Sequence, residues 1–151
     1  MAESRASAVW EGNLVEGHGR VSAASGVFAD LDLTWEARTN RPHPGTSPEE
    51  LIAAAHAACY AMAFAHALAE AGHAPEQVSV AAVCHFTPVE GGGFSVSRMD
   101  LDVHGRVPGL DQAAFEELAD AGDRGCPVSN ALRGNVEIRL TAALDSLHGR
   151  V

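Results

Sequence analysis

Three cysteines, Cys59, Cys84 and Cys126, are the residues of this 151-residue chain best suited to nucleophilic or redox chemistry. A deprotonated thiol attacks electrophiles, and two thiols that meet can be oxidised to a disulfide. Cys126 precedes Pro127 at the predicted start of a short helix, where unpaired backbone N–H groups favour an anion and lower a thiol pKa. The same position suits a cysteine that only caps a turn, so both interpretations stay open.

Cys59 and Cys84 both lie in apolar segments. Cys59 sits in the middle of a predicted helix, within H-A-A-C-Y-A-M, where a buried cysteine is most often a small core residue. Cys84 alternates with Val80 and Ala82 along a predicted strand. From pattern alone, Cys59 is either a core residue or a reactive thiol, and Cys84 is predicted to fill the sheet core.

The basic residues restrict the chemistry further, because all 10 are arginine and none is lysine. This composition excludes lysine Schiff bases, lysine general bases and P-loop phosphate binding. Any cation beside a thiolate must then be an arginine or a protonated histidine.

The formal net charge of −10 argues against nucleic acid and anionic membrane surfaces as partners. The first residues lack the basic start and apolar run of a secretory signal, so a cytoplasmic location with reduced thiols is expected.

A metal site is not expected, and no cofactor is predicted. His56 with Cys59, and Cys84 with His85, are candidate zinc ligands, but the chain has no C-x-x-C and no H-x-x-x-H. Adjacent strand residues point to opposite faces, so Cys84 and His85 cannot readily reach one metal.

The first forty residues predict strands at 7–12, 19–28 and 32–38, where β-branched and aromatic residues are broken by glycine and asparagine. Along the last of these, Trp35 would face inward, and Arg38 would point the other way or mark the end of the strand.

A long helix is predicted over 48–71. Ser47 is its expected N-cap, with Glu50 as the reciprocal partner in a capping box and Gly72 as the left-handed stop. Glu49, in the first turn, would stabilise the helix start by its charge alone.

The remaining elements predict an α+β fold. Strands at 78–89 and 94–107 flank the turn E-G-G-G, and a helix covers 111–121, ended by the following glycine. C-P-V-S-N-A-L begins a short helix, and a last strand covers 135–144. Together they predict a single domain over 1–151, with about six antiparallel strands in its sheets and two main helices.

The long helix is apolar nearly all round, which predicts burial on most sides. Its length would allow a membrane span, but His56, His66 and Glu70 and the weakly apolar alanines favour a central buried helix of a soluble protein. Since the chain is short, a second copy is the natural cover for the remaining faces. A homodimer with a helical centre is therefore expected.

Two blocks of residues resemble the OsmC/Ohr family of hydroperoxide reductases: G-T-S-P-E-E-L-I-A-A-A-H-A-A-C-Y-A-M at 45–62 and C-P-V-S-N-A-L at 126–132. A-x-W-E-G at 8–12 and V-P-G-L-D at 107–111 add to the likeness, which covers nearly the whole chain. H-A-A-C and W-E-G resemble the osmotically inducible OsmC branch, and S-N-A-L-R-G-N leans toward the organic hydroperoxide resistance branch; the OsmC branch is favoured.

The resemblance implies a thiol peroxidase. Its peroxidatic cysteine falls on Cys59, its resolving cysteine on Cys126 and its helix-start glutamate on Glu49. Its catalytic arginine falls on Arg38. The loop after Arg38 is one residue longer than in the family, so Arg41 and Arg20 are competing candidates. The implied fold is an intertwined α/β homodimer with two active sites at the interface.

The same resemblance implies substrates and partners. The chemistry would reduce organic hydroperoxides, and hydrogen peroxide less well, through a sulfenic acid on Cys59 and a Cys59–Cys126 disulfide. A dithiol, in this family a dihydrolipoyl group rather than thioredoxin, would then regenerate the thiols.

The spacing of Glu49 and Cys59 adds one geometric hypothesis. They are ten residues apart on one predicted helix, which is about 15 Å of rise, so Glu49 of one subunit is expected to serve Cys59 of the other. Two other functions remain open: a non-catalytic dimer that binds apolar molecules at its interface, and a thiol hydrolase that pairs Cys59 with His56. The second is disfavoured because a histidine three residues away on the same helix lies alongside the thiol.

Overall fold

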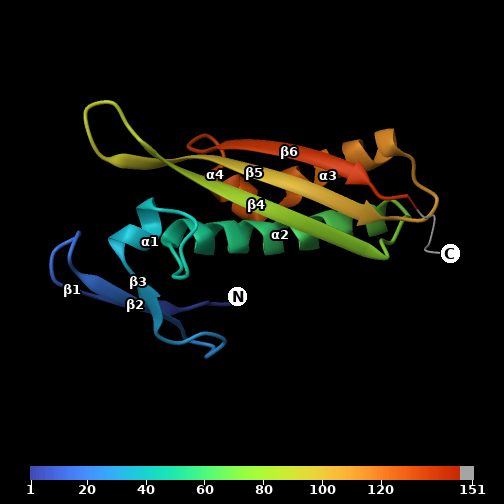
Figure 1. The fold of residues 1–151 in the computed structure, drawn as a ribbon. Coiled ribbons are helices and arrows are strands. Elements are labelled where there is room, and N and C mark those ends of the chain that lie inside the picture. The colour runs from blue at the N-terminus through green and yellow to red at the C-terminus, as the bar shows by residue number, and fades with distance from the viewer. Residues whose placement is uncertain (147–151) are drawn as a thin grey trace. The chain divides into compact units, whose positions relative to one another are not determined.

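A computed structural model describes residues 1–146, which form six strands and four helices in two compact units, 1–51 and from residue 52 onward. The single domain expected over 1–151 stays a prediction. The elements in chain order are β1 (Ala6–Glu11), β2 (His18–Ala23), β3 (Leu31–Leu33), α1 (Trp35–Thr39), α2 (Pro48–Glu70), β4 (Gln77–Pro88), β5 (Phe94–Arg106), α3 (Gln112–Gly125), α4 (Pro127–Leu132) and β6 (Glu137–Leu144) (Figure 1).

The first unit contains an antiparallel meander in the order β1-β2-β3. Gly19 is required where β2 passes beneath Trp10, because a Cβ at this position would lie 2.7 Å from the indole. The strand predicted over 32–38 is wrong beyond residue 33. Thr34 accepts a hydrogen bond from the Ala37 N–H at 3.0 Å and caps α1, so Arg38 lies on a helix.

The predicted start and length of α2 are confirmed. The Ser47 hydroxyl accepts from the Glu50 N–H at 3.1 Å, and Gly72 has the left-handed φ of +84° expected after a helix end. The capping box is only half formed, because the Glu50 carboxylate accepts from the Thr46 hydroxyl at 2.7 Å and from Arg41 at 2.9 Å.

The second unit contains a three-stranded sheet in the order β4-β5-β6. The predicted hairpin of β4 and β5 is confirmed, and the three glycines of its turn all have positive φ. The expectation of antiparallel pairing throughout is wrong for β6, which pairs parallel to β5. The reason is the connection between them: it carries α3 and α4 over the sheet, and such a crossover returns the chain in the same direction.

Helices α3 and α4 meet at Cys126, which is at once the C-cap of α3 and the N-cap of α4. The predicted cap Asp111 accepts from the Ala114 N–H at 2.8 Å. The predicted stop at Gly122 is wrong, because α3 continues through it to Gly125. Gly122 serves packing: a Cβ there would lie 3.0 Å from the Phe64 Cα.

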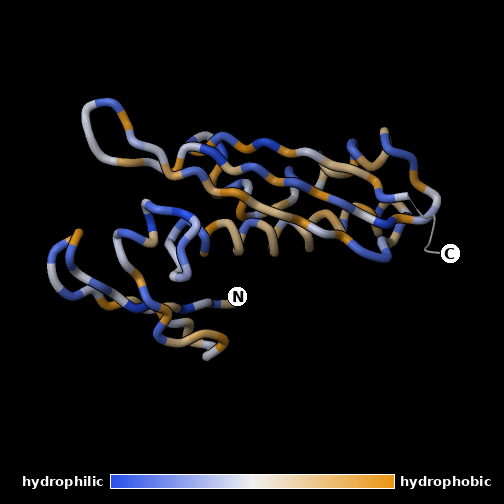
Figure 2. Tube along the Cα trace, viewed as in Figure 1, coloured by the Kyte–Doolittle hydropathy of each residue, from blue (hydrophilic) through white to orange (hydrophobic). Residues whose placement is uncertain are grey.

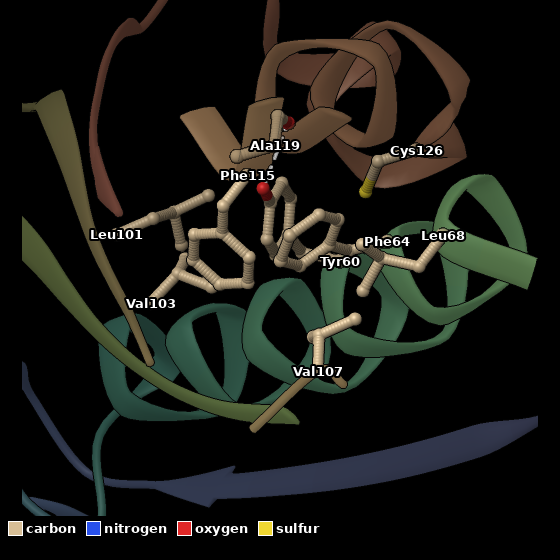
Figure 3. Packing of buried hydrophobic residues seen from close by; sticks show 9 residues of the cluster. All are labelled: Tyr60, Phe64, Leu68, Leu101, Val103, Val107, Phe115, Ala119 and Cys126. Carbon is tan, nitrogen blue, oxygen red and sulfur yellow. Dashed lines mark hydrogen bonds between the residues drawn. The ribbon is translucent and has the colours of Figure 1, made fainter. Parts of the chain in front are cut away.

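The core of the second unit lies between the sheet and its helices. Tyr60, Phe64 and Leu68 of α2 are fully buried against Leu101 and Val103 of β5, Phe115 and Ala119 of α3, and Cys126 (Figure 3). The Phe64 and Phe115 rings meet edge to face at 5.0 Å, and the Tyr60 hydroxyl donates to the Ala119 carbonyl at 2.8 Å. This hydrogen bond satisfies the one polar group of an otherwise apolar cluster.

The faces of α2 differ in burial although most of its residues are apolar (Figure 2). Its buried stripe, with residues spaced four apart, begins at His56 and ends at Leu68. Another face of the helix is exposed and includes Ala55, Ala58 and Met62, the last of which is 74% exposed. Length and composition alone would also suit a membrane span. The chain's own second-unit elements therefore cover only part of the helix that the sequence predicts to be central and buried.

Candidate active site

The second unit brings Cys59 and Cys126 together. Cys59 lies half-buried on α2, Cys126 is fully buried at the α3–α4 junction, and neither is in a disulfide. Cys59 packs against the buried cluster that contains Cys126, and both the Cys126 thiol and the Val128 backbone N–H influence its pKa. Figure 3 shows the Cys126 sulfur pointing toward α2. Two neighbouring thiols can be joined by oxidation when their Cα atoms lie within about 4.4–6.8 Å.

The surroundings of Cys59 favour its neutral form. Burial raises the pKa of Cys59; the Val128 N–H lowers it, and the neighbouring Cys126 raises it again, with a raised pKa as the net result. Since the thiolate is the reactive species, Cys59 needs a cation in addition to these groups.

The first unit brings Arg38 and Glu49 together. The Arg38 guanidinium donates from Nη2 to Glu49 Oε1 at 2.8 Å and from Nε to the same carboxylate at 3.0 and 3.2 Å. Glu49 is only 5% exposed, whereas the Arg38 side chain is 33% exposed. The guanidinium also lies 6.0 Å from the ring centre of Trp35. A carboxylate bonded in this forked manner fixes the plane of an arginine.

The two competing arginines have different surroundings. Arg41 donates to the carbonyls of Ala37 and Gly45, at 3.2 and 2.6 Å, and pairs with Glu50. These bonds give Arg41 a role in holding the loop before α2. Arg20 is exposed on β2, where it faces Val9 and Asp32 in the register of the meander. Arg38 is therefore the arginine that the structure pairs with Glu49.

A buried polar pair lies next to the two cysteines. His56 and Ser129 are both fully buried, and His56 Nε2 lies 2.7 Å from Ser129 Oγ. Burial lowers the pKa of His56, with Asp123 raising it and Arg133 lowering it to smaller extents, so the imidazole is neutral at neutral pH. His56 Nδ1 is buried without a hydrogen-bond partner among the described residues. The Cys59–His56 hydrolase stays an alternative, which is disfavoured because the histidine lies alongside the thiol on one helix. His56 and Ser129 each lie three residues from a cysteine, and this spacing could have drawn attention to each of them. Their pairing could not be predicted, because they are 73 positions apart and no sequence pattern joins them.

Cys84 is half-buried on β4 and not fully buried as a sheet-core residue would be. Val80 and Ala82 of the same strand pack against the core cluster. The neighbour of Cys84, His85, lies 2.7 Å from Asp100 and 3.1 Å from Arg98 on β5. Across residues 1–146, no group of three or more histidine, cysteine and acidic side chains could hold a metal ion.

Comparison with known proteins gives these pairs a context. The family model described as OsmC-like protein matches residues 38–141, which contain Arg38, Glu49 and both cysteines of the pair. The chain belongs to the OsmC-like family. Peroxiredoxin OsmC of Escherichia coli (strain K12) is 36% identical over 134 residues, which are 89% of this chain and 92% of that protein.

Further relatives agree in sequence and in fold. The organic hydroperoxide resistance protein of Xanthomonas axonopodis pv. citri (strain 306) is 37% identical over 100 residues, or 66% of this chain and 68% of that protein. The crystal structure of the organic hydroperoxide resistance protein OhrB of Bacillus subtilis matches with a TM-score of 0.73 and 29% identity, covering 92% of this chain and 98% of that one. The OsmC-like α+β fold predicted from the two sequence blocks is thereby confirmed. These relatives support a peroxidase with a hydroperoxide-detoxifying role.

Proposed function

We propose that this OsmC-like protein is a thiol-dependent peroxidase in which Cys59 attacks the peroxide and Cys126 resolves the product. The Cys59 thiolate attacks one peroxide oxygen, so that the O–O bond breaks and an S–O bond forms. The sulfur loses two electrons and becomes a sulfenic acid, and the departing alkoxide takes up a proton to become an alcohol, or water when hydrogen peroxide is the substrate.

The packing of the two cysteines carries this proposal. Because Cys59 packs against the cluster that contains Cys126, the sulfenic acid forms beside its resolving partner. Cys126 then attacks the Cys59 sulfur, an S–S bond replaces the S–O bond, and the hydroxide leaves as water with the proton of the Cys126 thiol. A dithiol reductant reopens the disulfide and is itself oxidised to a disulfide.

The Arg38–Glu49 pair would supply the cation that Cys59 lacks in its own surroundings. Arginine stays charged at any working pH, and Glu49 fixes its guanidinium through two nitrogens. A positive charge within a few ångströms lowers a thiol pKa and also stabilises the alkoxide that leaves.

We propose further that this pair acts on Cys59 of a second subunit. Ten residues of α2 separate Glu49 from Cys59, which is about 15 Å of helix rise. The exposed face of α2 with Ala55, Ala58 and Met62 offers an apolar surface for a homodimer. The hypothesis of a non-catalytic dimer uses the same surface but gives no reason for two neighbouring thiols.

The exposed face also supports a preference for organic hydroperoxides. Ala55, Ala58 and Met62 lie within one turn of Cys59 on α2, and such side chains favour an alkyl group over a second hydroxyl. Relatives carry the name organic hydroperoxide resistance protein. Turnover with cumene hydroperoxide and with hydrogen peroxide measures the preference for the peroxide. The same assays with dithiol and with monothiol donors measure the preference for the reductant.

The disulfide is the decisive product. One equivalent of cumene hydroperoxide, followed by alkylation and peptide mass spectrometry, should give a Cys59–Cys126 linkage and leave Cys84 alkylated. The Cys84→Ser variant serves as the control and should keep the linkage and the turnover rate. No 59–126 linkage in the parent protein, or slow alkylation of all three cysteines at neutral pH without turnover, would favour the non-catalytic dimer.

Mixed dimers test the sharing of a site between subunits. A heterodimer of one Glu49→Ala chain and one Cys59→Ser chain has one intact site if Glu49 serves the partner, and none if each chain serves itself. A heterodimer of the doubly substituted chain with the parent chain gives the reverse pattern and is the matched control. About half of the parent activity in the first heterodimer and almost none in the second is the expected result. The opposite pattern would place Glu49 and Cys59 of one chain in one site.

A further inference from the structure

The buried His56–Ser129 pair has no part in the proposed peroxidase chemistry. Each of its residues nevertheless lies about one helical turn from one of the two cysteines. His56 precedes Cys59 by three residues on α2, and Ser129 follows Cys126 by three residues in α4. Residues three apart on a helix share a face. The two elements therefore meet through two adjacent links, the packing of Cys59 against the cluster with Cys126 and the 2.7 Å contact of His56 with Ser129.

Ser129 also touches the resolving cysteine directly. Its backbone N–H donates to Cys126 Sγ at 3.4 Å, so a shift of Ser129 would carry the sulfur with it. The other polar links of α4 run back to the end of α3: Arg133 pairs with Asp123 at 2.8 Å and Asn130 donates to the Arg124 carbonyl at 3.0 Å. These bonds hold α4 to α3. They do not fix the distance between α4 and α2, which depends on other contacts.

The two links between α2 and α4 differ in how they respond to oxidation. When Cys59 becomes a sulfenic acid it loses its S–H group and gains an oxygen, so its packing against the cluster with Cys126 is altered by the reaction itself. The His56–Ser129 hydrogen bond contains no sulfur and keeps its partners. A disulfide closes only when the two Cα atoms are within about 4.4–6.8 Å, and a misplacement of about 1 Å can slow an oriented step by about a hundredfold.

We infer that His56 and Ser129 are positioning residues for the resolving step, because their buried hydrogen bond holds α4 against α2 while Cys126 attacks the oxidised Cys59. The inference rests on the proposed Cys59–Cys126 chemistry. It assigns the pair no role in the first step, since neither side chain is exposed to a peroxide.

A single-turnover experiment separates the two steps. The Ser129→Ala and His56→Ala variants receive one equivalent of cumene hydroperoxide with dimedone present, and mass spectrometry measures the dimedone adduct on Cys59, the 59–126 linkage and the sulfinic acid. We expect peroxide consumption within about twofold of the parent rate and disulfide formation slowed about tenfold or more. The sulfenic acid then persists, so the dimedone adduct and, with excess peroxide, the sulfinic acid should increase.

Rescue distinguishes positioning from general stabilisation. His56→Gln keeps a side-chain N–H near the place of Nε2 and should recover most of the disulfide rate, whereas His73→Gln, just after α2, should match the parent. Ser129→Ala removes one oxygen and keeps the packing, so it remains a test if His56→Ala does not fold. Disulfide formation at the parent rate in folded Ser129→Ala would overturn the inference. Absence of the linkage in the parent itself would instead overturn the proposed function.

Discussion

The Cys59 thiol is surrounded by groups that keep it protonated, and this fact defines what the rest of its site must supply. Burial and the neighbouring Cys126 outweigh the Val128 N–H, so the pKa of Cys59 is raised. A peroxidatic cysteine needs a lowered pKa, because the thiolate is the reactive species. Arg38, oriented by buried Glu49, is the charge that we expect to reverse the balance.

Loss of the Arg38 charge should therefore raise the pKa of Cys59 and reduce its reactivity. A nearby opposite charge shifts a pKa by about 1–3 units, so Arg38→Met should lower kcat/KM for cumene hydroperoxide at pH 7 by about 10- to 100-fold. The pH profile of Cys59 alkylation should move to higher pH. Arg41→Met is the control, because Arg41 binds backbone carbonyls and Glu50. An equal loss in both variants would contradict the assignment of Arg38.

A second residue gives a pH-dependent signal away from the thiols. The hydrogen bond to Asp145 raises the pKa of His104; partial desolvation opposes the shift, and Asp102 adds to it. Because the folded-state pKa lies above the unfolded value, this interaction stabilises the fold fully below that unfolded value, and the stabilisation is lost as pH rises through the folded-state pKa. Asp145→Asn should lower the His104 titration midpoint measured by NMR, whereas Asp32→Asn should leave it in place. An unchanged midpoint in Asp145→Asn would show that Asp145 is not the cause.

At the scale of elements, α2, α3 and α4 position the two thiols through close packing. Helix α3 approaches α2 at Gly122, where the absence of a side chain leaves room for Phe64. Cys126 then follows at the α3–α4 junction with no intervening loop. The position of the resolving thiol thus depends on how closely two helices meet.

A methyl group at position 122 should push these helices apart. A Cβ would lie 3.0 Å from the Phe64 Cα and 3.1 Å from its Cβ, so Gly122→Ala should destabilise the protein by about 1–3 kcal/mol despite the better helix propensity of alanine. Urea unfolding measures the change. Gly125→Ala is the matched control, since nothing lies within 4 Å of its added Cβ, and it should be neutral or stabilise by up to about 1 kcal/mol. Equal stability of the two variants would refute the packing argument.

At the scale of the whole molecule, the proposed homodimer would combine a cysteine pair and an arginine–glutamate pair that belong to different compact units. The net charge of −10 applies to each subunit, so apolar contact rather than charge attraction has to hold two copies together. The exposed Met62 side chain marks the apolar face available for that contact.

A charge on this face should dissociate the dimer. Met62→Glu would place a carboxylate in an apolar interface, and burial of an unpaired charge is strongly unfavourable. Sedimentation velocity should show a dimer for the parent and a monomer for Met62→Glu, with a loss of peroxidase activity. Ala113→Glu, an exposed apolar position on α3, should remain dimeric. A monomeric parent would refute the homodimer, and a dimeric Met62→Glu would place the interface elsewhere.

Local signals were sufficient wherever the deciding interaction lies within a few residues. The Ser47 cap and Gly72 determined α2, the glycine-rich turn determined the β4–β5 hairpin, and Pro127 after Cys126 determined the start of α4. In the segment ending at Arg38, β-branched and aromatic residues predicted a strand. The Thr34 cap produced a helix there instead, although the cap itself is a local signal that the alternating pattern obscured.

By itself, the sequence determined the main elements, the family and the residues on which a thiol peroxidase could be built, because capping, turn chemistry and motif blocks act over short distances. Only the tertiary structure decided that Arg38 rather than Arg41 pairs with Glu49, that Gly122 serves packing rather than a helix end, and that β6 runs parallel to β5. It also brought His56 to Ser129. Each of these outcomes depends on which distant segments meet, and burial makes such contacts selective, since a buried charge or polar group has to find its partner there.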